Sequence, residues 1–139
     1  MPIMNKSIFL VDAGTNMDKL QSTITKFPNS LIFTLDYEIH LLLQKYGIQH
    51  ELGENILTTD DFNKIDTSSI NLTENCFKLF KNELTVQNIF LPELIEHEIF
   101  QYFLIQFLKS YVILKILENY QSEQIFDFTN FHDFINKIT

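Results

Sequence analysis

Apolar positions in the first fifty residues follow two different periods. Residues 7–11 and 31–35 are short runs with almost no polar interruption, which is typical of parallel strands covered on both faces. Residues 17–27 and 37–46 instead place apolar side chains three and four positions apart, as one face of a helix requires. The alternation of these two patterns predicts a β-α-β arrangement.

Polar residues mark the ends of these elements. Asn16 and Asp36 stand immediately before the two helical patterns and suit the N-cap position, where a side-chain oxygen accepts from the first turn. Gly47 follows the second pattern and suits a left-handed C′ residue. These signals predict where both helices begin and where the second one ends.

The rest of the chain is predicted to contain further strands, shorter helices and one long helix. Residues 48–52 are polar enough for an edge strand. Residues 66–69 are small and polar, and they should break a helix. The expected elements are a helix over 60–65, a helical stretch over 71–84, an extended segment over 86–91, a long helix over 92–119, a linker over 121–124, a strand over 125–128 and a helix over 131–137.

Right-handed crossovers place the first three strands successively to one side. The long segment between the third and fourth strands allows the fourth strand to lie beside the first. The predicted fold class is therefore α/β, a Rossmann-like parallel sheet of about four strands in the order 3-2-1-4. Flanking helices and one long buried helix complete a single domain over residues 1–139.

Ligands of such sheets bind in the crevice at the point where the strand order reverses, beyond the carboxyl ends of the strands. Here that crevice lies between the ends of the first and fourth strands. The alternative is that acids in these loops only cap the strand ends. The candidate ligand-binding residues are Asp12, Gly14, Thr15, Asn16, Asp127, Thr129 and Asn130.

The chemistry available in that crevice is limited. A single Gly14 does not make the Gly-x-Gly-x-x-Gly turn of dinucleotide sites, although Asp36 lies at a suitable distance for a ribose-binding acid. Asp12 and Asp127 are candidates for paired acid and base carboxylates, but acids that cap loops explain them equally simply. We assign no catalytic residue and expect no cofactor.

No metal centre is expected either. Glu93, Glu96 and His97 have helical spacing, yet solvated acids in a first helical turn beside a surface histidine are the more common reading. Cys76 has no cysteine partner and lies on a helical apolar face, which is typical of a core thiol.

Composition and charge exclude several classes of protein. With 139 residues, 45% of them hydrophobic, and 14 Phe, the chain is a folded globular protein. A net charge of −8 disfavours nucleic acid and anionic membrane surfaces, which reward clustered Lys and Arg. A lone cysteine and a start without a signal-peptide pattern indicate the cytoplasm.

The apolar stretch from Ile99 to Leu117 is nearly as long as a membrane-spanning helix. Polar and charged residues interrupt it, and each charge near the centre of a spanning helix costs about 2.5–3.5 kcal/mol. We therefore expect a buried helix and no membrane insertion. The interrupting residues are Gln101, Gln106, Lys109, Ser110 and Lys115.

Several segments together resemble the N-terminal Rossmann-like domain of GT-B-type glycosyltransferases of surface-polysaccharide pathways and the related sugar-nucleotide 2-epimerases. The resemblance covers nearly the whole chain, but the chain ends before a C-terminal donor domain would begin. The segments that carry it are Ser7–Thr15, Leu31–Ile48, Thr59–Phe62, Leu91–Glu98 and Ile125–Phe128.

Two functional hypotheses follow. The resemblance implies an acceptor-side, non-catalytic binding module that takes a sugar or nucleotide-sugar ligand and acts with a donor-binding partner protein. The apolar long helix and the unfinished sheet instead suggest a homo-oligomeric interaction domain without a small-molecule site. In that case a homodimer should bury Phe100, Phe103, Phe107 and Tyr111.

Overall fold

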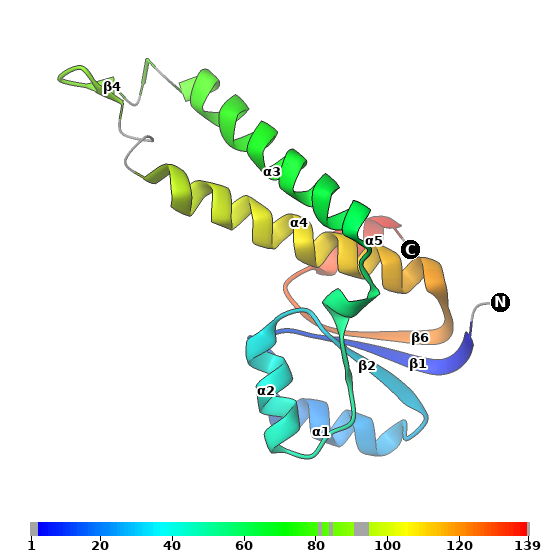
Figure 1. The fold of residues 1–139 in the computed structure, drawn as a ribbon. Helices are drawn as coiled ribbons and strands as arrows, with labels where there is room; N and C mark the ends of the chain where they lie inside the picture. Colours follow the sequence, from blue (N-terminus) through cyan, green and yellow to red (C-terminus); the bar gives the residue numbers. More distant parts are fainter. Residues whose placement is uncertain (1–2, 81, 84, 91–94, 139) are drawn as a thin grey trace. The chain divides into compact units, whose positions relative to one another are not determined.

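The computed structural model describes residues 3–80, 82–83, 85–90 and 95–138. The described chain consists of short strands, five α-helices and one 3-10 turn (Figure 1). Their bounds are β1 Ile3–Val11, α1 Met17–Lys26, β2 Ser30–Thr34, α2 Tyr37–Lys45, β3 Glu51–Leu52, η1 Gly53–Ile56, α3 Thr59–Phe80, β4 Thr85–Val86, β5 Ile89–Phe90, α4 Glu96–Asn119, β6 Tyr120–Phe128 and α5 His132–Ile138.

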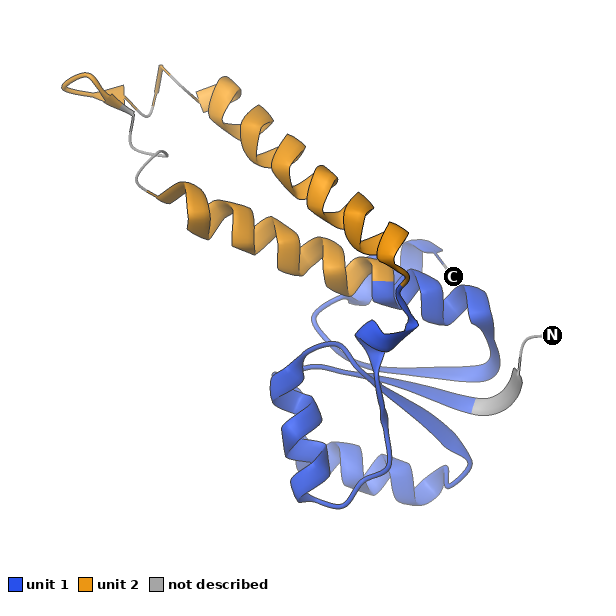
Figure 2. Cartoon of the chain, in the orientation of Figure 1, with its two compact units in different colours: residues 1–57, 112–139 blue, residues 58–111 orange. Residues whose placement is uncertain are grey.

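The chain divides into two compact units (Figure 2). Unit 1 comprises residues 1–57 and 112–139, and unit 2 comprises residues 58–111. Because α4 runs from Glu96 to Asn119, this one helix contributes its first two thirds to unit 2 and its last turns to unit 1.

Unit 1 is an α/β unit built on a four-stranded sheet. The strand order is β3-β2-β1-β6, and every neighbouring pair is parallel. This confirms the predicted order 3-2-1-4 and the Rossmann-like arrangement.

Helices cover both faces of this sheet (Figure 1). On one face, Phe9 and Val11 of β1 pack with Leu20 of α1 and with Ile39 and Leu43 of α2. On the other face the core combines side chains of the strands with the end of α4 and with α5, namely Ile8, Leu10, Phe33, Leu35, Val112, Ile113, Ile116 and Ile135. The central strand β1 is therefore fully enclosed from Ile8 to Val11, which explains its uninterrupted apolar pattern.

The predicted helix boundaries of unit 1 are confirmed by their caps. Asn16 accepts from Lys19 N at 3.0 Å and begins α1, and Asp36 accepts from Ile39 N at 2.9 Å and begins α2. Gly47 has a φ of +67° directly after the C-cap of α2, a conformation that favours glycine.

Three strands of unit 1 differ from their predicted lengths, and the first of them, β1, begins at Ile3 instead of residue 7. The edge strand β3 has only two residues, Glu51 and Leu52. In contrast β6 has nine residues and includes the segment 121–124, which was expected to be a linker. The expectation was wrong because Ser122 and Gln124 continue the ladder with β1, where main-chain pairing requires no apolar side chain.

In unit 2 a single 22-residue helix, α3, replaces the two shorter helices expected from the sequence. The small polar segment 66–69 does not break it. The Ser69 hydroxyl donates to Ile65 O at 2.7 Å and the Thr73 hydroxyl donates to Ser69 O at 2.8 Å. These side chains hydrogen-bond back within the helix instead of competing with it.

The segment that was expected to be extended forms a small antiparallel hairpin, β4 and β5. Its two turn residues, Gln87 and Asn88, have positive φ values of 50° and 64°. Two consecutive left-handed residues give the type I′ geometry that matches the twist of a hairpin.

The long helix α4 is less buried than expected. Only Val112, Ile113 and Ile116 are buried, and all three lie in unit 1. Among the described residues, α4 is long and apolar enough to cross a membrane by length and composition, and 17% of its most apolar window is buried. The expectation of burial along its whole length was therefore wrong for the part of α4 in unit 2.

Candidate functional site

The loops at the carboxyl ends of β1 and β6 lie side by side. The pairing register places Val11 opposite Phe128, so the loop over 12–16 and the loop over 129–131 leave the sheet at the same edge. The structure thus brings the candidate ligand-binding residues together at the point where the strand order reverses.

Asp12 joins the two loops from a buried position. Its side chain is 3% exposed, and its Oδ1 accepts from Gly14 N at 3.0 Å. Its Oδ2 accepts from Asn130 N, on the other loop, at 3.3 Å. Both carboxylate oxygens therefore stabilise the protein's own main chain.

Thr15 is also engaged within the fold. Its hydroxyl accepts from Asp12 N and donates to Phe128 O, each at 3.1 Å. This hydroxyl therefore spans from the loop after β1 to the end of β6, and both its donor and acceptor capacities are in use.

Asp127 organises the second loop. Its Oδ1 accepts from Thr129 N at 2.8 Å and from the Thr129 hydroxyl at 2.5 Å, and Thr129 Oγ1 accepts from Phe131 N at 3.1 Å. Its Oδ2 is buried and makes no hydrogen bond of normal geometry within the described residues, but His132 Nδ1 lies 2.5 Å away. A protonated His132 would form an ion pair with this oxygen.

Asp36 connects α2 to the first loop. Its Oδ2 accepts from Ala13 N at 2.8 Å while its Oδ1 caps α2. Helix capping and loop attachment therefore use both carboxylate oxygens. To bind a ribose, Asp36 would have to break its hydrogen bonds with Ala13 N and Ile39 N.

Three of the seven candidate residues remain exposed at this edge of the sheet, namely Gly14, Asn16 and Asn130. Asn16 caps α1, and Gly14 N donates to Asp12, so the side-chain amide of Asn130 is the main accessible polar group among them. A Cβ atom built on Gly14 would come no nearer than 3.4 Å to a neighbouring atom, so the loop conformation does not require glycine. The arrangement suits capped loops better than a preformed polar pocket.

A groove of about 440 Å³ lies beside β6 and reaches Asp127. It is bordered by β6 and α5. The residues that line it are Ser122, Glu123, Gln124, Ile125, Asp127, His132, Ile135 and Asn136.

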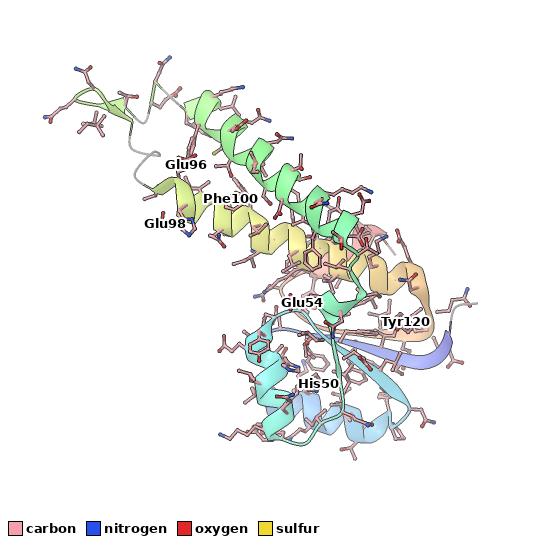
Figure 3. The ribbon with its side chains drawn as sticks, in the orientation of Figure 1. His50, Glu54, Glu96, Glu98, Phe100 and Tyr120 are labelled. Carbon is pink, nitrogen blue, oxygen red and sulfur yellow. The ribbon has the colours of Figure 1, made fainter. Side chains whose placement is uncertain are left out.

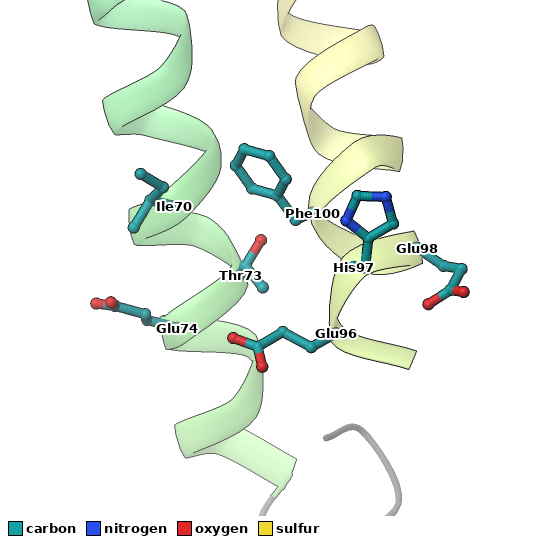
Figure 4. A pocket seen from close by; sticks show the side chains of 7 residues that line it. All are labelled: Ile70, Thr73, Glu74, Glu96, His97, Glu98 and Phe100. Atoms are coloured by element: carbon teal, nitrogen blue, oxygen red, sulfur yellow. The ribbon is translucent and has the colours of Figure 1, made fainter. Parts of the chain in front are cut away.

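In unit 2 a cavity of about 510 Å³ lies between α3 and α4 (Figure 4). Its lining combines apolar side chains with carboxylates, and Glu96, Glu98 and Phe100 come from the first turns of α4 (Figure 3). The described residues include no group of three or more side chains suited to a metal ion, and Glu93 lies outside them. The full lining is Ile70, Thr73, Glu74, Glu96, His97, Glu98 and Phe100.

The four residues predicted to form a dimer interface, Phe100, Phe103, Phe107 and Tyr111, lie on α4 within unit 2 and are all half-buried. Their neighbours Tyr102 and Ile105 are more exposed, at 60% and 46%. The apolar side chains of this part of α4 thus reach solvent on more than one face.

One contact was not foreseen from the sequence. His40 Nδ1 of α2 lies 2.8 Å from His50 Nε2, and His50 Nδ1 lies 2.7 Å from Ile48 O (Figure 3 labels His50). Since a carbonyl oxygen only accepts, His50 carries its proton on Nδ1 and its neutral form receives a hydrogen bond from His40. The pair attaches the segment before β3 to α2.

No family model, curated protein or solved structure matches the chain.

Proposed function

We propose that this protein is an interaction domain that self-associates through the helical hairpin of unit 2. The observation that carries the proposal is the distribution of exposed apolar side chains. Of the fourteen exposed large apolar residues in the described part of the chain, ten belong to unit 2, which holds fewer than half of the residues. We call these ten the hairpin surface: Phe62, Ile70, Leu72, Leu79, Phe80, Val86, Ile89, Ile95, Tyr102 and Ile105.

Unit 2 buries few apolar side chains. Among its described residues, Ile65 is the one buried hydrophobic side chain, and the other buried residues are Asp61, Ser69 and Thr73. Full burial of one such side chain contributes only about 1.5–3 kcal/mol. A helical hairpin with so small a core gains most from a partner that covers its apolar faces.

A second copy of the chain is the partner that suits this surface. Two helical hairpins pack as a four-helix bundle, in which each helix buries an apolar stripe. Tyr102 and Ile105, which are exposed and three positions apart on α4, have the spacing of such a stripe. Phe100 and Tyr111, in contrast, line cavities together with residues of α3 in the same chain. Aromatic residues at the centre of an interface also supply most of its binding energy.

The charges of unit 2 give this association a distinctive salt dependence. Its described residues include seven carboxylates and three lysines, so two copies repel each other. Salt screens this repulsion without weakening apolar contacts. Self-association through the hairpin should therefore tighten as the ionic strength rises.

The test is light scattering over a wide range of protein concentration, on the wild type and on the double variant Tyr102→Glu/Ile105→Glu. Both side chains are exposed, so the variant should fold normally. Loss of two apolar contacts at about 2 kcal/mol each should raise the dissociation constant for self-association through the helical hairpin at least tenfold. Leu41→Glu/Tyr46→Glu, at a position in α2 and at its C-cap with 49% and 51% exposure, is the matched control and should leave the mass unchanged.

Equal masses for the wild type and the hairpin variant at every concentration would reject the proposal. So would association that weakens with added salt, because that result indicates attraction between opposite charges.

A second candidate is favoured by the adjacent loops after β1 and β6. The exposed side-chain amide of Asn130 could bind an acceptor sugar or a nucleotide-sugar, with a separate partner protein holding the donor. This is the acceptor-side, glycosyltransferase-like module that the sequence resemblance implies. Chemical-shift changes at Asp12, Thr15 and Asn130 on titration with UDP-sugars would support it, and no change at millimolar ligand would count against it.

A further inference from the structure

The strand β6 forms the long edge of the sheet in unit 1. β6 pairs with β1 over its nine residues, and no described strand lies on its other side. The opposite edge of the sheet ends in the two-residue strand β3. An edge strand of this length presents a row of unpaired N–H and C=O groups that can pair with another strand.

Natural edge strands usually carry devices that prevent such pairing, including proline, lysine and β-bulges. β6 contains neither proline nor lysine. The sequence separation between paired residues stays constant from Ile3 opposite Tyr120 to Val11 opposite Phe128, so its ladder has no bulge. Of its two carboxylates, Asp127 is bonded to Thr129, which leaves Glu123 as the exposed charge on this edge.

The space beside the strand is open. The groove between β6 and α5 is lined by the four consecutive residues from Ser122 to Ile125. Successive side chains of a strand point to opposite faces of the sheet, so a groove that all four border runs along the strand edge. This space suits an added strand rather than a compact ligand.

We propose that β6 pairs with β6 of a second copy, antiparallel and about a twofold axis normal to the sheet, so that two four-stranded sheets become one of eight strands. Such an axis lies midway between the two strands. It must be level with one residue, which then lies opposite its own copy, because paired side chains lie on the same face of the sheet.

The charges select the position of that axis. An axis at Glu123 places this carboxylate opposite itself, and an axis at Ile125 places Glu123 opposite Asp127. Like charges directly opposite are destabilising. An axis at Gln124 avoids both clashes and pairs all nine residues, with Glu123 opposite Ile125 of the second copy and Gln121 opposite Asp127 of the second copy.

The register gives a direct test by disulfide cross-linking. At the axis, residue 124 faces its own copy with Cβ atoms about 4.5–5.5 Å apart, which is close to the separation that a disulfide needs. Gln124→Cys in a Cys76→Ser background should therefore form a covalent dimer under mild oxidation. Gln124 is exposed, so the change should not disturb the fold.

Gln121→Cys in the same background is the matched control. In the proposed register its two copies lie about 20 Å apart, six residues along the strands. The variant at position 124 should cross-link at least tenfold faster than this control. Equal rates for the two variants, or no cross-link at position 124 at high protein concentration, would overturn the proposal.

Adding Tyr102→Glu/Ile105→Glu to both cysteine variants separates this inference from the hairpin proposal. Cross-linking at position 124 should persist in that background, because β6 and the hairpin surface belong to different units. If the double variant abolishes both the cross-link and the association through the helical hairpin, β6 does not pair by itself and the inference is rejected.

Discussion

Replacement of Asp12 distinguishes a structural loop from a binding site. In Asp12→Asn the amide oxygen can keep the bond from Gly14 N, but the NH₂ group then faces Asn130 N, which is also a donor. Hydrogen bonds to a charged acceptor contribute about 1.5–3 kcal/mol each. Because Asp12 is 3% exposed, water cannot replace the lost acceptor, and we expect Asp12→Asn to lower the free energy of unfolding by about 2 kcal/mol. Asp12→Ala, which removes both acceptors, should cost about 3–4 kcal/mol.

The assay is urea unfolding followed by circular dichroism, with thermal melting as a second measurement. In a protein of this size a loss of 2 kcal/mol lowers Tm by several degrees, on the order of 5–10 °C. Asp18→Asn is the control, since Asp18 is an exposed first-turn acid of α1 and should contribute about 0.5 kcal/mol through the helix dipole.

A stability for Asp12→Asn within about 0.5 kcal/mol of the wild type would refute this reasoning. Polar groups kept for ligand binding often cost stability, so their removal is neutral or stabilising. A neutral result would therefore favour the loops after β1 and β6 over the hairpin surface as the functional region.

Three further predictions follow from single contacts. Gly53→Ala should lower stability by about 1–3 kcal/mol in thermal melts, because a Cβ atom there would overlap the carbonyl oxygen of Thr34; an unchanged Tm would show that η1 can shift. Gln87→Gly should stabilise the β4–β5 turn by up to about 1 kcal/mol, since Gln87 has a φ of 50°. Loss of the NMR cross-peaks between β4 and β5 in this variant would contradict the prediction. A hydrogen bond and the charge of Asp60 raise the pKa of Lys64 above 10.5, so this pair stabilises below that pH and the effect is lost as the pH rises through the raised value; an Nζ titration that is the same in Asp60→Asn would disprove the pairing.

Local signals in the sequence predicted most of unit 1. Apolar runs gave β1 and β2, and Asn16 and Asp36 marked the helix starts that the structure has. These features depend on residues within a few positions of each other, so the sequence pattern contains the necessary information. The strand order followed because right-handed crossovers leave few topologies.

The errors arose where a tertiary partner decides the local structure. Gln121 to Gln124 look like a linker, but β1 supplies the ladder that makes them part of β6. The hydroxyl groups of Ser69 and Thr73 could equally have broken α3, and their actual bonds depend on the helix being formed.

The candidate site shows the same division. The predicted topology placed the loops after β1 and β6 side by side, as the structure has them. It could not show whether their side chains are already hydrogen-bonded within the fold. Asp12 and Asn130 are 118 positions apart, and no local pattern predicts their hydrogen bond. The contact between His40 and His50 was missed for the same reason, because it joins a helix to a segment beyond a glycine turn.

The continuity of α4 has a consequence for its internal motions. Its residues Val112, Ile113 and Ile116 are at most 1% exposed, whereas the described residues from Glu96 to Tyr111 are all at least partly accessible. Amide hydrogens in the last turns should therefore exchange with solvent only on global unfolding, and those of the first turns by local fraying. The same helix thus contains a slow and a fast exchanging segment. A partner that covers the hairpin surface should slow amide exchange in the first turns of α4 without changing exchange in its last turns.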